Sequence, residues 1–508
     1  MCKRVKNGGA IPGCHQLQDK YLPDVYTAER ARLKELLHGQ KIAVIFDEMS
    51  DDEGRFVLNI LFAPLTENSD GRVISYLAAT EFLPRTNHST VSQAVIKALQ
   101  SYEIDFDNVV VFDTDNAAYM KKAYTTVLSA LFPNSVHVTC LAHIINLVGE
   151  SFRAPFTELN HFVRAFSAMF FMAGCRKARY LDFLKSKLAS EIPHTADPLP
   201  SDSGHNTENT KSEGVKATMA PNPVATRWNS WFYAVQYHVH NFHLYRDFIK
   251  EEMAICGKNA PQSVHTLQEM LSSPITSLAI EAQIRCVAET CEPILHNLDR
   301  LESQIPCTLQ AFDVLEELQL YLESNAQVPD ELDKFLSDEL PLDQRRKMLE
   351  LFALAFRTAA DKLVKYVSND KDGQPAINFL REIRIFDPKR VCLLSHNRQD
   401  YAHVPGMSLV PQTKFDLYIN TLAPQAVTVA GGLWSNKQVT VFWASVQDKL
   451  PNLCRIAKTY MLAVCNSADA ERSNSLYNLI LSDRRRSLSP DSLKALMFLY
   501  CNKYYNVA

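Results

Sequence analysis

Two acidic residues stand where apolar runs of the sequence end. Asp47 follows the β-branched and aromatic run 42–46, and Asp115 lies just beyond the apolar run 109–112. Carboxylates at neighbouring strand ends of an α/β sheet can hold a pair of Mg²⁺ ions about 3.5–4 Å apart for phosphoryl-transfer chemistry. Asp113 competes with Asp115 for this role because it lies closer to the apolar run. A turn or a helix cap is the commoner use of Asp at such positions, and the spacing alone leaves that alternative open.

Cys140 and His143 have the Cys-x-x-His spacing of half a zinc site. No second Cys/His pair at finger spacing lies nearby in the sequence, so no structural zinc is expected. The favoured interpretation is a buried cysteine with a hydrogen-bonded histidine in the first turn of a helix. Cys286 and Cys291, on a predicted helix, are likewise expected to be core residues rather than ligands.

Two arginine-containing segments are candidates for contacts with DNA. Arg227 beside Trp228 can clamp a phosphate while the indole stacks on a base, and the alternative is a tryptophan that anchors the start of a helix. The run Arg484, Arg485 and Arg486 could pair with backbone phosphates in bidentate fashion. It could equally be a solvated helix end, where cations are favourable.

The elements around the two aspartates follow an α/β order. Apolar runs predict strands near residues 41–47, 55–63, 73–82, 109–113 and 136–140, and helices over 91–99, 116–131 and from 141 onward. The order β-β-β-α-β-α-β-α describes an antiparallel meander followed by strands that alternate with helices. We therefore expect one mixed sheet whose first three strands are antiparallel, with Asp47 at the end of its strand.

The rest of the chain is expected to be mainly helical. From about 145 to 465 the apolar residues recur with a period of about 3.6, interrupted at 193–223 by a polar segment that we expect to be poorly ordered. Two helices close the chain, one over 468–481 and one that begins at Ser489-Pro490. The last helix carries an apolar stripe that must be covered, either within the chain or by a second copy. Its members are Leu493, Leu496, Met497, Tyr500, Cys501 and Tyr504.

The composition is that of a globular intracellular protein. With 508 residues, 46% of them hydrophobic and 22% charged, the chain is long enough for about three to four structural units. The longest apolar stretch, 165–175, is too short to span a bilayer, so no membrane association is expected. The 12 cysteines have no repeating spacing, which indicates a reducing compartment. A formal charge of −4 excludes a strongly basic nucleic-acid binder, so any DNA contact must come from local patches or from a further domain.

Five separated motifs, taken together and in order, resemble those of the transposases of the hAT superfamily (hobo, Activator, Tam3) and of host proteins derived from them. The motifs lie at 44–50, 114–120, 140–143, 226–230 and 468–475. The resemblance covers the chain from roughly residue 20 to its end, and it brings in Glu471, which lies more than 300 residues beyond Asp115. It implies a catalytic and metal-binding set of Asp47, Asp115 and Glu471 that uses Mg²⁺ or Mn²⁺.

The resemblance also implies a fold and a set of partners. The expected fold is α/β, an RNase H-like mixed sheet interrupted by a large all-α insertion, with C-terminal helices that return to the sheet. The corresponding parts are a lead-in over 1–40, the first part of the core over 41–145, the insertion over 146–440 and a dimerising C-terminal segment over 441–508. The implied activity is metal-dependent DNA strand cleavage and transfer in the nucleus, by a homodimer or larger assembly. Trp228 would stack on a displaced base, and His143 would shape the site and its DNA contacts.

Some features depart from the family pattern. No Cys/Cys/His/His cluster of an N-terminal BED zinc finger is found, since only Cys2 and Cys14 precede Cys140. Glu48 and Asn474 stand where many members have an aromatic residue. A second interpretation is therefore a domesticated, transposon-derived protein that associates with DNA or chromatin as a dimer without catalysis.

Overall fold

The computed structural model describes residues 12–191, 217–224, 228–324, 330–368, 373–429, 436–481 and 488–505. The chain forms two compact units. The first comprises residues 1–145, 297–319 and 363–508, and the second comprises residues 146–296 and 320–362. Residues 297–319 and 363–440, which the sequence places in the insertion, thus belong to the unit that contains the sheet.

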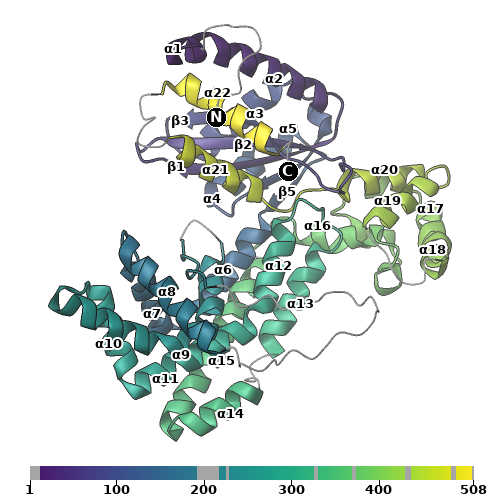
Figure 1. The fold of residues 1–508 in the computed structure, drawn as a ribbon. Coiled ribbons are helices and arrows are strands. Elements are labelled where there is room, and N and C mark those ends of the chain that lie inside the picture. Colours follow the sequence, from purple (N-terminus) through teal and green to yellow (C-terminus); the bar gives the residue numbers. More distant parts are fainter. Residues whose placement is uncertain are drawn as a thin grey trace, which may run out of the picture. The chain divides into compact units, whose positions relative to one another are not determined.

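The first unit is built on one five-stranded mixed sheet, as the sequence predicts (Figure 1). Its strands are β1 (Ile42–Ser50), β2 (Phe56–Pro64), β3 (Tyr76–Leu83), β4 (Val109–Thr114) and β5 (Val136–Thr139). The spatial order is β3-β2-β1-β4-β5. The β1–β2 and β2–β3 pairs are antiparallel, whereas β1–β4 and β4–β5 are parallel.

One expectation about β1 is wrong. The strand does not end at Asp47, because its antiparallel pairing with β2 continues to the pair Ser50 and Phe56. What does end there is the parallel pairing with β4, whose last pair is Phe46 and Thr114. The hairpin then closes through a turn in which the Gly54 N–H donates to the Asp51 carbonyl at 2.9 Å. Gly54 has φ +75°, a conformation that glycine adopts without strain.

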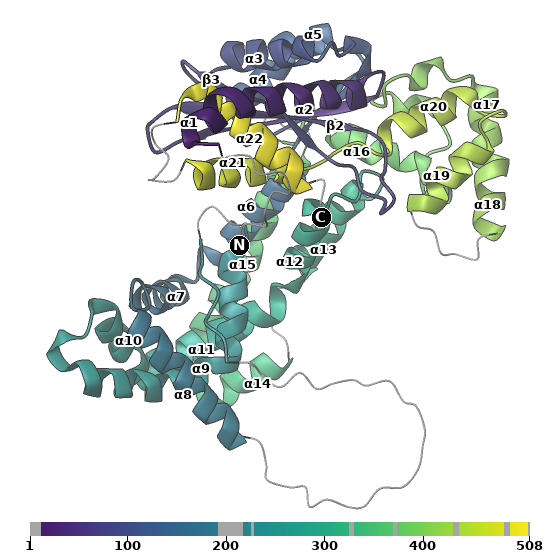
Figure 2. The ribbon, with the colours of Figure 1, turned by 45° about the horizontal axis from the view of Figure 1, so that its top comes forward.

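Alternation along β1 separates an apolar face of the sheet from a face that carries polar groups. Ile42, Val44 and Phe46 belong to the main apolar core together with residues of α3 (His88–Ser101). Asp47, one position later, points to the opposite face, where its carboxylate accepts a hydrogen bond from α21 (Ala468–Ile480). Figure 2 shows α3 and α21 on opposite sides of the sheet. The apolar face therefore packs into the main core, and the opposite face carries the Asp47 carboxylate.

The C-terminal helices pack on the sheet. α21 lies against β1 and β2, and α22 (Pro490–Tyr505) lies against β3, α21 and α2 (Leu22–Leu37). The Ser489 hydroxyl accepts the Ser492 N–H at 3.2 Å, which confirms the predicted start of α22. Half of the predicted apolar stripe is covered within the chain, since Leu493, Met497 and Cys501 are fully buried.

Two members of that stripe are not fully buried. Leu496 is half-buried and Tyr500 is 44% exposed. The side chain of Tyr504 lies outside the described residues.

The remaining helices lie mostly between residues 141 and 460, which confirms the predicted helical character of the middle of the chain. In chain order they are α1 (Cys14–Gln16), α4 (Ala118–Ala123), α5 (Ser129–Leu131), α6 (Leu141–Arg153), α7 (Thr157–Met169), α8 (Gly174–Glu191), α9 (Ser230–Cys256), α10 (Gln262–Ser272), α11 (Pro274–Thr290), α12 (Glu292–Glu302), α13 (Ala311–Ser324), α14 (Asp330–Glu339), α15 (Leu342–Val367), α16 (Ile377–Glu382), α17 (Gln412–Leu417), α18 (Ala423–Val429), α19 (Asn436–Ser445) and α20 (Pro451–Tyr460). Cys286 and Cys291 are buried core residues, as expected.

The polar segment expected at 193–223 lies outside the described residues up to 216, and residues 217–223 have no regular secondary structure. Within the described ranges, none of the helices combines the length and the apolar character needed to cross a bilayer.

Side-chain amides close both edges of the sheet. At β3, Asn502 accepts the Leu77 N–H at 2.9 Å and donates to the Leu77 carbonyl at 3.0 Å. At β5, Gln374 accepts the Thr139 N–H at 2.9 Å and donates to the Thr139 carbonyl at 2.5 Å. Each amide therefore satisfies a buried backbone pair that would otherwise lack partners at the edge of the sheet.

Replacing Asn502 by Ala should lower the free energy of unfolding by about 2–4 kcal/mol, because each buried backbone group left without a partner costs about 1–3 kcal/mol. Urea unfolding followed by circular dichroism measures the loss. Asn478→Ala, at an exposed position on α21, is the matched control and should change the stability by less than about 0.5 kcal/mol. Equal stabilities for the two variants would contradict the role assigned to Asn502.

Candidate active site

Asp47 and Asp115 lie at the same level of the sheet, just beyond the last pair of the β1–β4 ladder. The β1–β4 pairing ends at Phe46 and Thr114, so each aspartate is the next residue along its own strand. Asp47 is buried beside Asn59 of β2, whereas Asp115 is half-buried and accepts the Ala117 N–H at 3.1 Å. The topology thus places the two carboxylates predicted from the sequence next to each other, with Asp115 accessible from outside.

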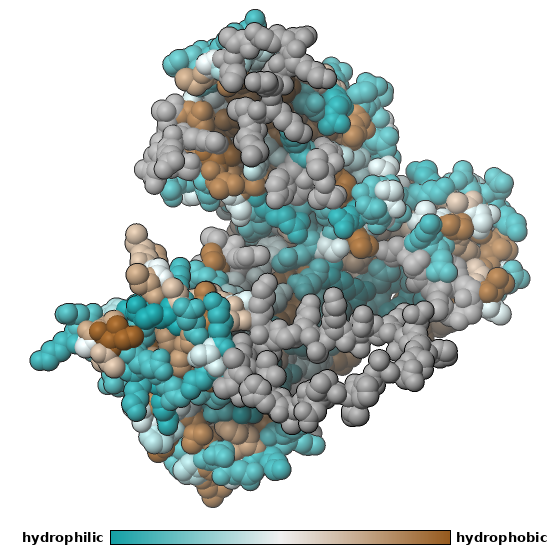
Figure 3. All heavy atoms as spheres, in the orientation of Figure 1, coloured by the Kyte–Doolittle hydropathy of each residue, from teal (hydrophilic) through white to brown (hydrophobic). Residues whose placement is uncertain are grey.

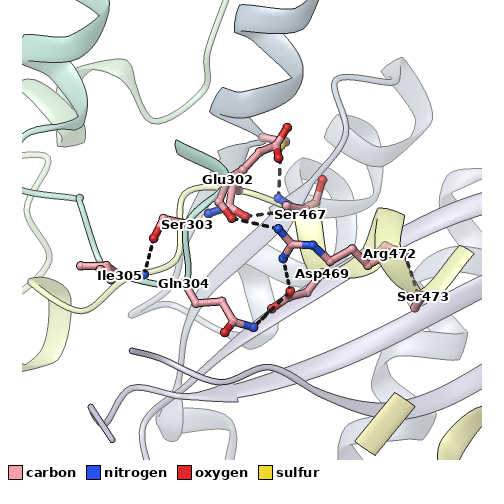
Figure 4. Close-up of polar contacts among 12 residues, drawn as sticks. Glu302, Ser303, Gln304, Ile305, Ser467, Asp469, Arg472 and Ser473 are labelled. Atoms are coloured by element: carbon pink, nitrogen blue, oxygen red, sulfur yellow. Dashed lines mark hydrogen bonds and ion pairs between the residues drawn. The ribbon is translucent and has the colours of Figure 1, made fainter. Parts of the chain in front are cut away.

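Glu471 reaches the same face from the first turn of α21, and a polar network fixes the start of that helix (Figure 4). Asp469 accepts hydrogen bonds from Arg472 at 2.6 Å and from Gln304 at 3.2 Å. Arg472 also donates to the Glu302 carbonyl at 3.3 Å. The segment 302–304 therefore holds the first turn of α21, and with it the position of Glu471.

The three carboxylates influence one another electrostatically. Burial raises the pKa of Asp47 well above its usual value, and the charges of Glu471 and Asp115 raise it further. Burial and the charge of Asp115 raise the pKa of Glu471, and burial also raises the pKa of Asp115. Repulsion between clustered anions is expected to raise their pKa values, but burial contributes more to the increase here. The tertiary structure has therefore brought Glu471 close to the two aspartates.

The raised pKa values give the cluster a definite pH dependence. Suppose that a carboxyl group has a higher pKa in the folded chain than in the unfolded chain. The folded state then loses stability as pH rises from the unfolded pKa to the folded pKa. Glu471→Gln should therefore raise the melting temperature near neutral pH, and the gain should vanish on acidification below the pKa of an unfolded glutamate. Thermal unfolding at pH values from about 4, near the ordinary carboxyl pKa, to about 8 measures the difference in melting temperature between the variant and the parent. Glu35→Gln, on the exposed side of α2, is the control, and an equal gain there would refute the interpretation.

Asp113 lies deeper on the same face. It is fully buried, and neither carboxylate oxygen has a hydrogen-bond partner within the described structure. Burial and the neighbouring charge of Asp47 raise its pKa well above the usual value. Because Asp113 has no exposed surface whereas Asp115 does, Asp115 is the better placed of the two to meet a ligand.

The Cys-x-x-His segment has a structural role at the start of α6. The Cys140 Sγ accepts the N–H groups of His143 at 3.3 Å and Ser467 at 3.2 Å. The Leu141 N–H donates to the Cys465 carbonyl at 3.0 Å. Burial, followed by the charge of Asp113, raises the pKa of the Cys140 thiol to about 12. The buried thiol thus joins α6 to the segment that precedes α21, in keeping with the interpretation favoured from the sequence.

Several polar residues surround the carboxylates. Burial raises the pKa of Asp115, and the hydrogen bond from Ala117 and the electrostatic influence of His143 and Lys121 offset part of this increase. The Tyr119 hydroxyl donates to Glu48 at 3.0 Å. His143 was expected at the site from the sequence, whereas Lys121 and Tyr119 were missed, since their type and spacing carry no distinctive signal.

The other expected DNA-contact residues belong to the second unit or lie outside the described residues. Trp228 is half-buried in the turn before α9 and belongs to the second unit. Arg227 and the run Arg484, Arg485 and Arg486 lie outside the described residues.

The donor chemistry of the cluster suits a hard divalent cation. In the described part of the chain, no three His, Cys, Asp or Glu side chains are already gathered into a ligand group. Mg²⁺ commonly needs only one or two protein carboxylates, with water and substrate phosphates completing its shell. Buried carboxylates with raised pKa values, including the unpartnered oxygens of Asp113, would be stabilised by a cation nearby.

Comparison with known families finds a match at the C-terminal part of the chain. Residues 427–502 match the model of the hAT family C-terminal dimerisation region, a segment that includes α21 with Glu471 and nearly all of α22. The search of the curated proteins found no match to the chain. The match covers the C-terminal part of the chain, which is therefore similar to the dimerisation region of hAT-family proteins.

Proposed function

We propose that this chain is a DDE-type transposase-like enzyme that cleaves and joins DNA strands with the help of Mg²⁺ or Mn²⁺. The observation that carries the proposal is the geometry: Asp47 and Asp115 directly follow the last pair of the parallel β1–β4 ladder, and α21, which carries Glu471, packs on β1 and hydrogen-bonds to Asp47 through Asn474. An RNase H-like core with a helical insertion is part of the proposal. It is supported by the antiparallel meander continued by two parallel strands.

In the proposed mechanism, the residues of the chain bind and orient the reactants. Asp47 and Asp115 would hold a divalent cation at the end of the β1–β4 pairing, and Glu471 would complete the set from α21. The cation would supply Lewis-acid polarisation of the phosphodiester and stabilise charge on the attacking and leaving oxygens. His143 and Lys121 lie close enough to Asp115 to lower its pKa, and their charges would favour a DNA phosphate at the same place.

The direct test is nicking of a supercoiled plasmid by the full chain in Mn²⁺ or Mg²⁺, with EDTA as the control. Cleavage that depends on the divalent cation and leaves 3′-hydroxyl ends supports the proposal. Absence of cleavage at any concentration of Mg²⁺ or Mn²⁺ would overturn it.

A domesticated, non-catalytic protein associated with DNA or chromatin is the second candidate. The observation that favours it is that the described side chains do not already form a group of three metal ligands. A protein that binds plasmid DNA but neither binds Mn²⁺ nor nicks the plasmid would establish this second function.

Self-association is supported by the matched dimerisation region, and we propose its surface at the beginning of that region. An open hollow of about 580 Å³ lies between α18 and α19. Apolar side chains predominate in its lining, among them Leu422, Ala426, Val429, Val441, Phe442 and Val446. Figure 3 shows apolar atoms on the surface of the group α17–α20. A second copy is the proposed occupant because seven of the ten lining residues lie within the matched region, while three of the six residues of the α22 stripe are fully buried within the chain.

Val441→Asp should therefore shift the protein from dimer toward monomer, because Val441 is 61% exposed in this hollow and a buried charge is costly at an interface. Light scattering at micromolar concentration measures the mass. Tyr500→Asp is the comparison variant on α22 and should leave the dimer largely intact. A monomeric Tyr500→Asp protein beside a dimeric Val441→Asp protein would place the interface on α22 instead, and a monomeric parent would overturn the dimer.

A further inference from the structure

A chain of three hydrogen bonds ends on the carboxylate of Asp47. The Thr80 hydroxyl donates to Asn59 Oδ1 at 2.7 Å, and Asn59 Nδ2 donates to Asn474 Oδ1 at 2.8 Å. Asn474 Nδ2 then donates to Asp47 Oδ2 at 2.8 Å. The chain crosses β3, β2 and α21 before it reaches β1. It is set by the sheet register, in which Asn59 is opposite both Thr80 and Asp47.

The direction of these hydrogen bonds is determined by their chemistry. In the ionised form that would bind a cation, the Asp47 carboxylate can only accept, so Asn474 must present its NH₂ group to Asp47 and its oxygen to Asn59. Asn59 then presents its own oxygen to Thr80, whose hydroxyl can donate. Thr80 and Asn59 are buried and Asn474 is half-buried, which limits competition from water. Each amide thus orients the next, and the last one holds one particular oxygen of Asp47.

An aromatic residue at position 474, which the family pattern favours, could not make these contacts. Phenylalanine has no donor for Asp47 and no acceptor for Asn59, and both polar groups would then need other partners. Asn474 therefore joins the helix that carries Glu471 to the strand that carries Asp47. Asp47 Oδ2 accepts from Asn474, and the Glu48 backbone also hydrogen-bonds to the carboxylate, so its orientation is fixed from two sides.

We propose that Asn474 is a positioning residue for Asp47, which holds the carboxylate in the orientation in which it binds a divalent cation. This inference rests on the proposed metal-dependent function. Residues that hydrogen-bond to metal ligands typically change metal affinity by about 10–100-fold when they are replaced. Thr80 and Asn59 act through Asn474, so their replacement should have a smaller effect in the same direction.

The test is titration of the full chain with Mn²⁺, with the free ion measured by electron paramagnetic resonance. Asn474→Leu keeps the approximate size of the side chain and removes its donor, and it should weaken Mn²⁺ binding by about 10–100-fold. Asn478→Leu, at an exposed position on the same helix, is the matched control and should bind as the parent does. Thr80→Val, which leaves Asn474 in place, should weaken binding by less than Asn474→Leu.

The outcomes separate the inference from the function on which it rests. A folded Asn474→Leu protein that binds Mn²⁺ as tightly as the parent would overturn the positioning role, even if its free energy of unfolding in urea is lower. A parent that does not bind Mn²⁺ would overturn the metal-dependent function and the positioning role together. If Asn474→Leu does not fold, the Mn²⁺ affinity of Thr80→Val tests the inference instead. An affinity equal to that of the parent would overturn the role of the hydrogen-bond chain.

Discussion

Replacing Asp47 by Asn should reduce metal-dependent strand cleavage by about 10²–10³-fold, the range seen when one group that stabilises transition-state charge is removed. The amide keeps the shape of the side chain, and its oxygen can still accept the hydrogen bond that Asn474 now donates to Asp47. The change therefore removes a charge without removing the packing. The nicking rate of supercoiled plasmid in Mn²⁺ measures the effect, and thermal unfolding verifies that the variant is folded.

The control is Asp52→Asn, at an exposed position in the adjoining hairpin turn, which should cleave at the parental rate. Asp115→Asn should lower the cleavage rate as much as Asp47→Asn does, because both residues directly follow the last pair of the β1–β4 ladder. Asp113→Asn should have a smaller effect, since Asp113 has no exposed surface. An inactive Asp113→Asn protein beside an active Asp115→Asn protein would transfer the proposed catalytic role to Asp113.

Replacing Asp51 by Ala should lower the free energy of unfolding by about 3–5 kcal/mol, the cost of breaking a buried ion pair from one side. The Asp51 carboxylate is buried and accepts the Arg55 Nε–H at 2.7 Å, the Arg55 backbone N–H at 2.9 Å and the Tyr477 hydroxyl at 2.8 Å. Tyr477 belongs to α21, so this cluster fixes the helix that carries Glu471 to the β1–β2 hairpin. Urea unfolding of the full chain measures the change.

The pH dependence of the same variant gives an independent check. Burial alone would raise the pKa of Asp51, but its hydrogen bonds with Arg55 and Tyr477 outweigh burial and lower it. A carboxyl group with a lowered pKa stabilises the fold above its unfolded pKa, and this contribution is lost as pH falls through the folded value. Asp51→Ala should therefore differ most from the parent near neutral pH and converge with it in acid. A difference that does not change with pH would show that lost packing, and not lost charge, causes the destabilisation.

Most of the secondary structure of the first unit could be predicted from local patterns. The apolar run before Asp47 and the runs around β2 and β4 identify strands, because burial on a sheet requires apolar side chains at short, regular spacing. Ser489-Pro490 identifies the start of α22 for a similarly local reason, since the hydroxyl accepts a backbone N–H of the first turn. The order of these elements was enough to predict a mixed sheet, and the motifs within them were enough to suggest the family.

The composition of the candidate site was decided only by the tertiary structure. Nothing local indicates that Glu471 approaches Asp47, because their proximity depends on how α21 packs on β1 and β2 through Asp51, Tyr477 and Asn474. The same holds for the sheet edges, where Asn502 and Gln374 contact strands that are distant in sequence. Periodicity reports which side of an element is buried, whereas hydrogen bonds and charge coupling depend on which elements become neighbours. The sequence by itself therefore determined the strands and helices and two of the three carboxylates, and the packing of α21 on the sheet decided that the third one joins them.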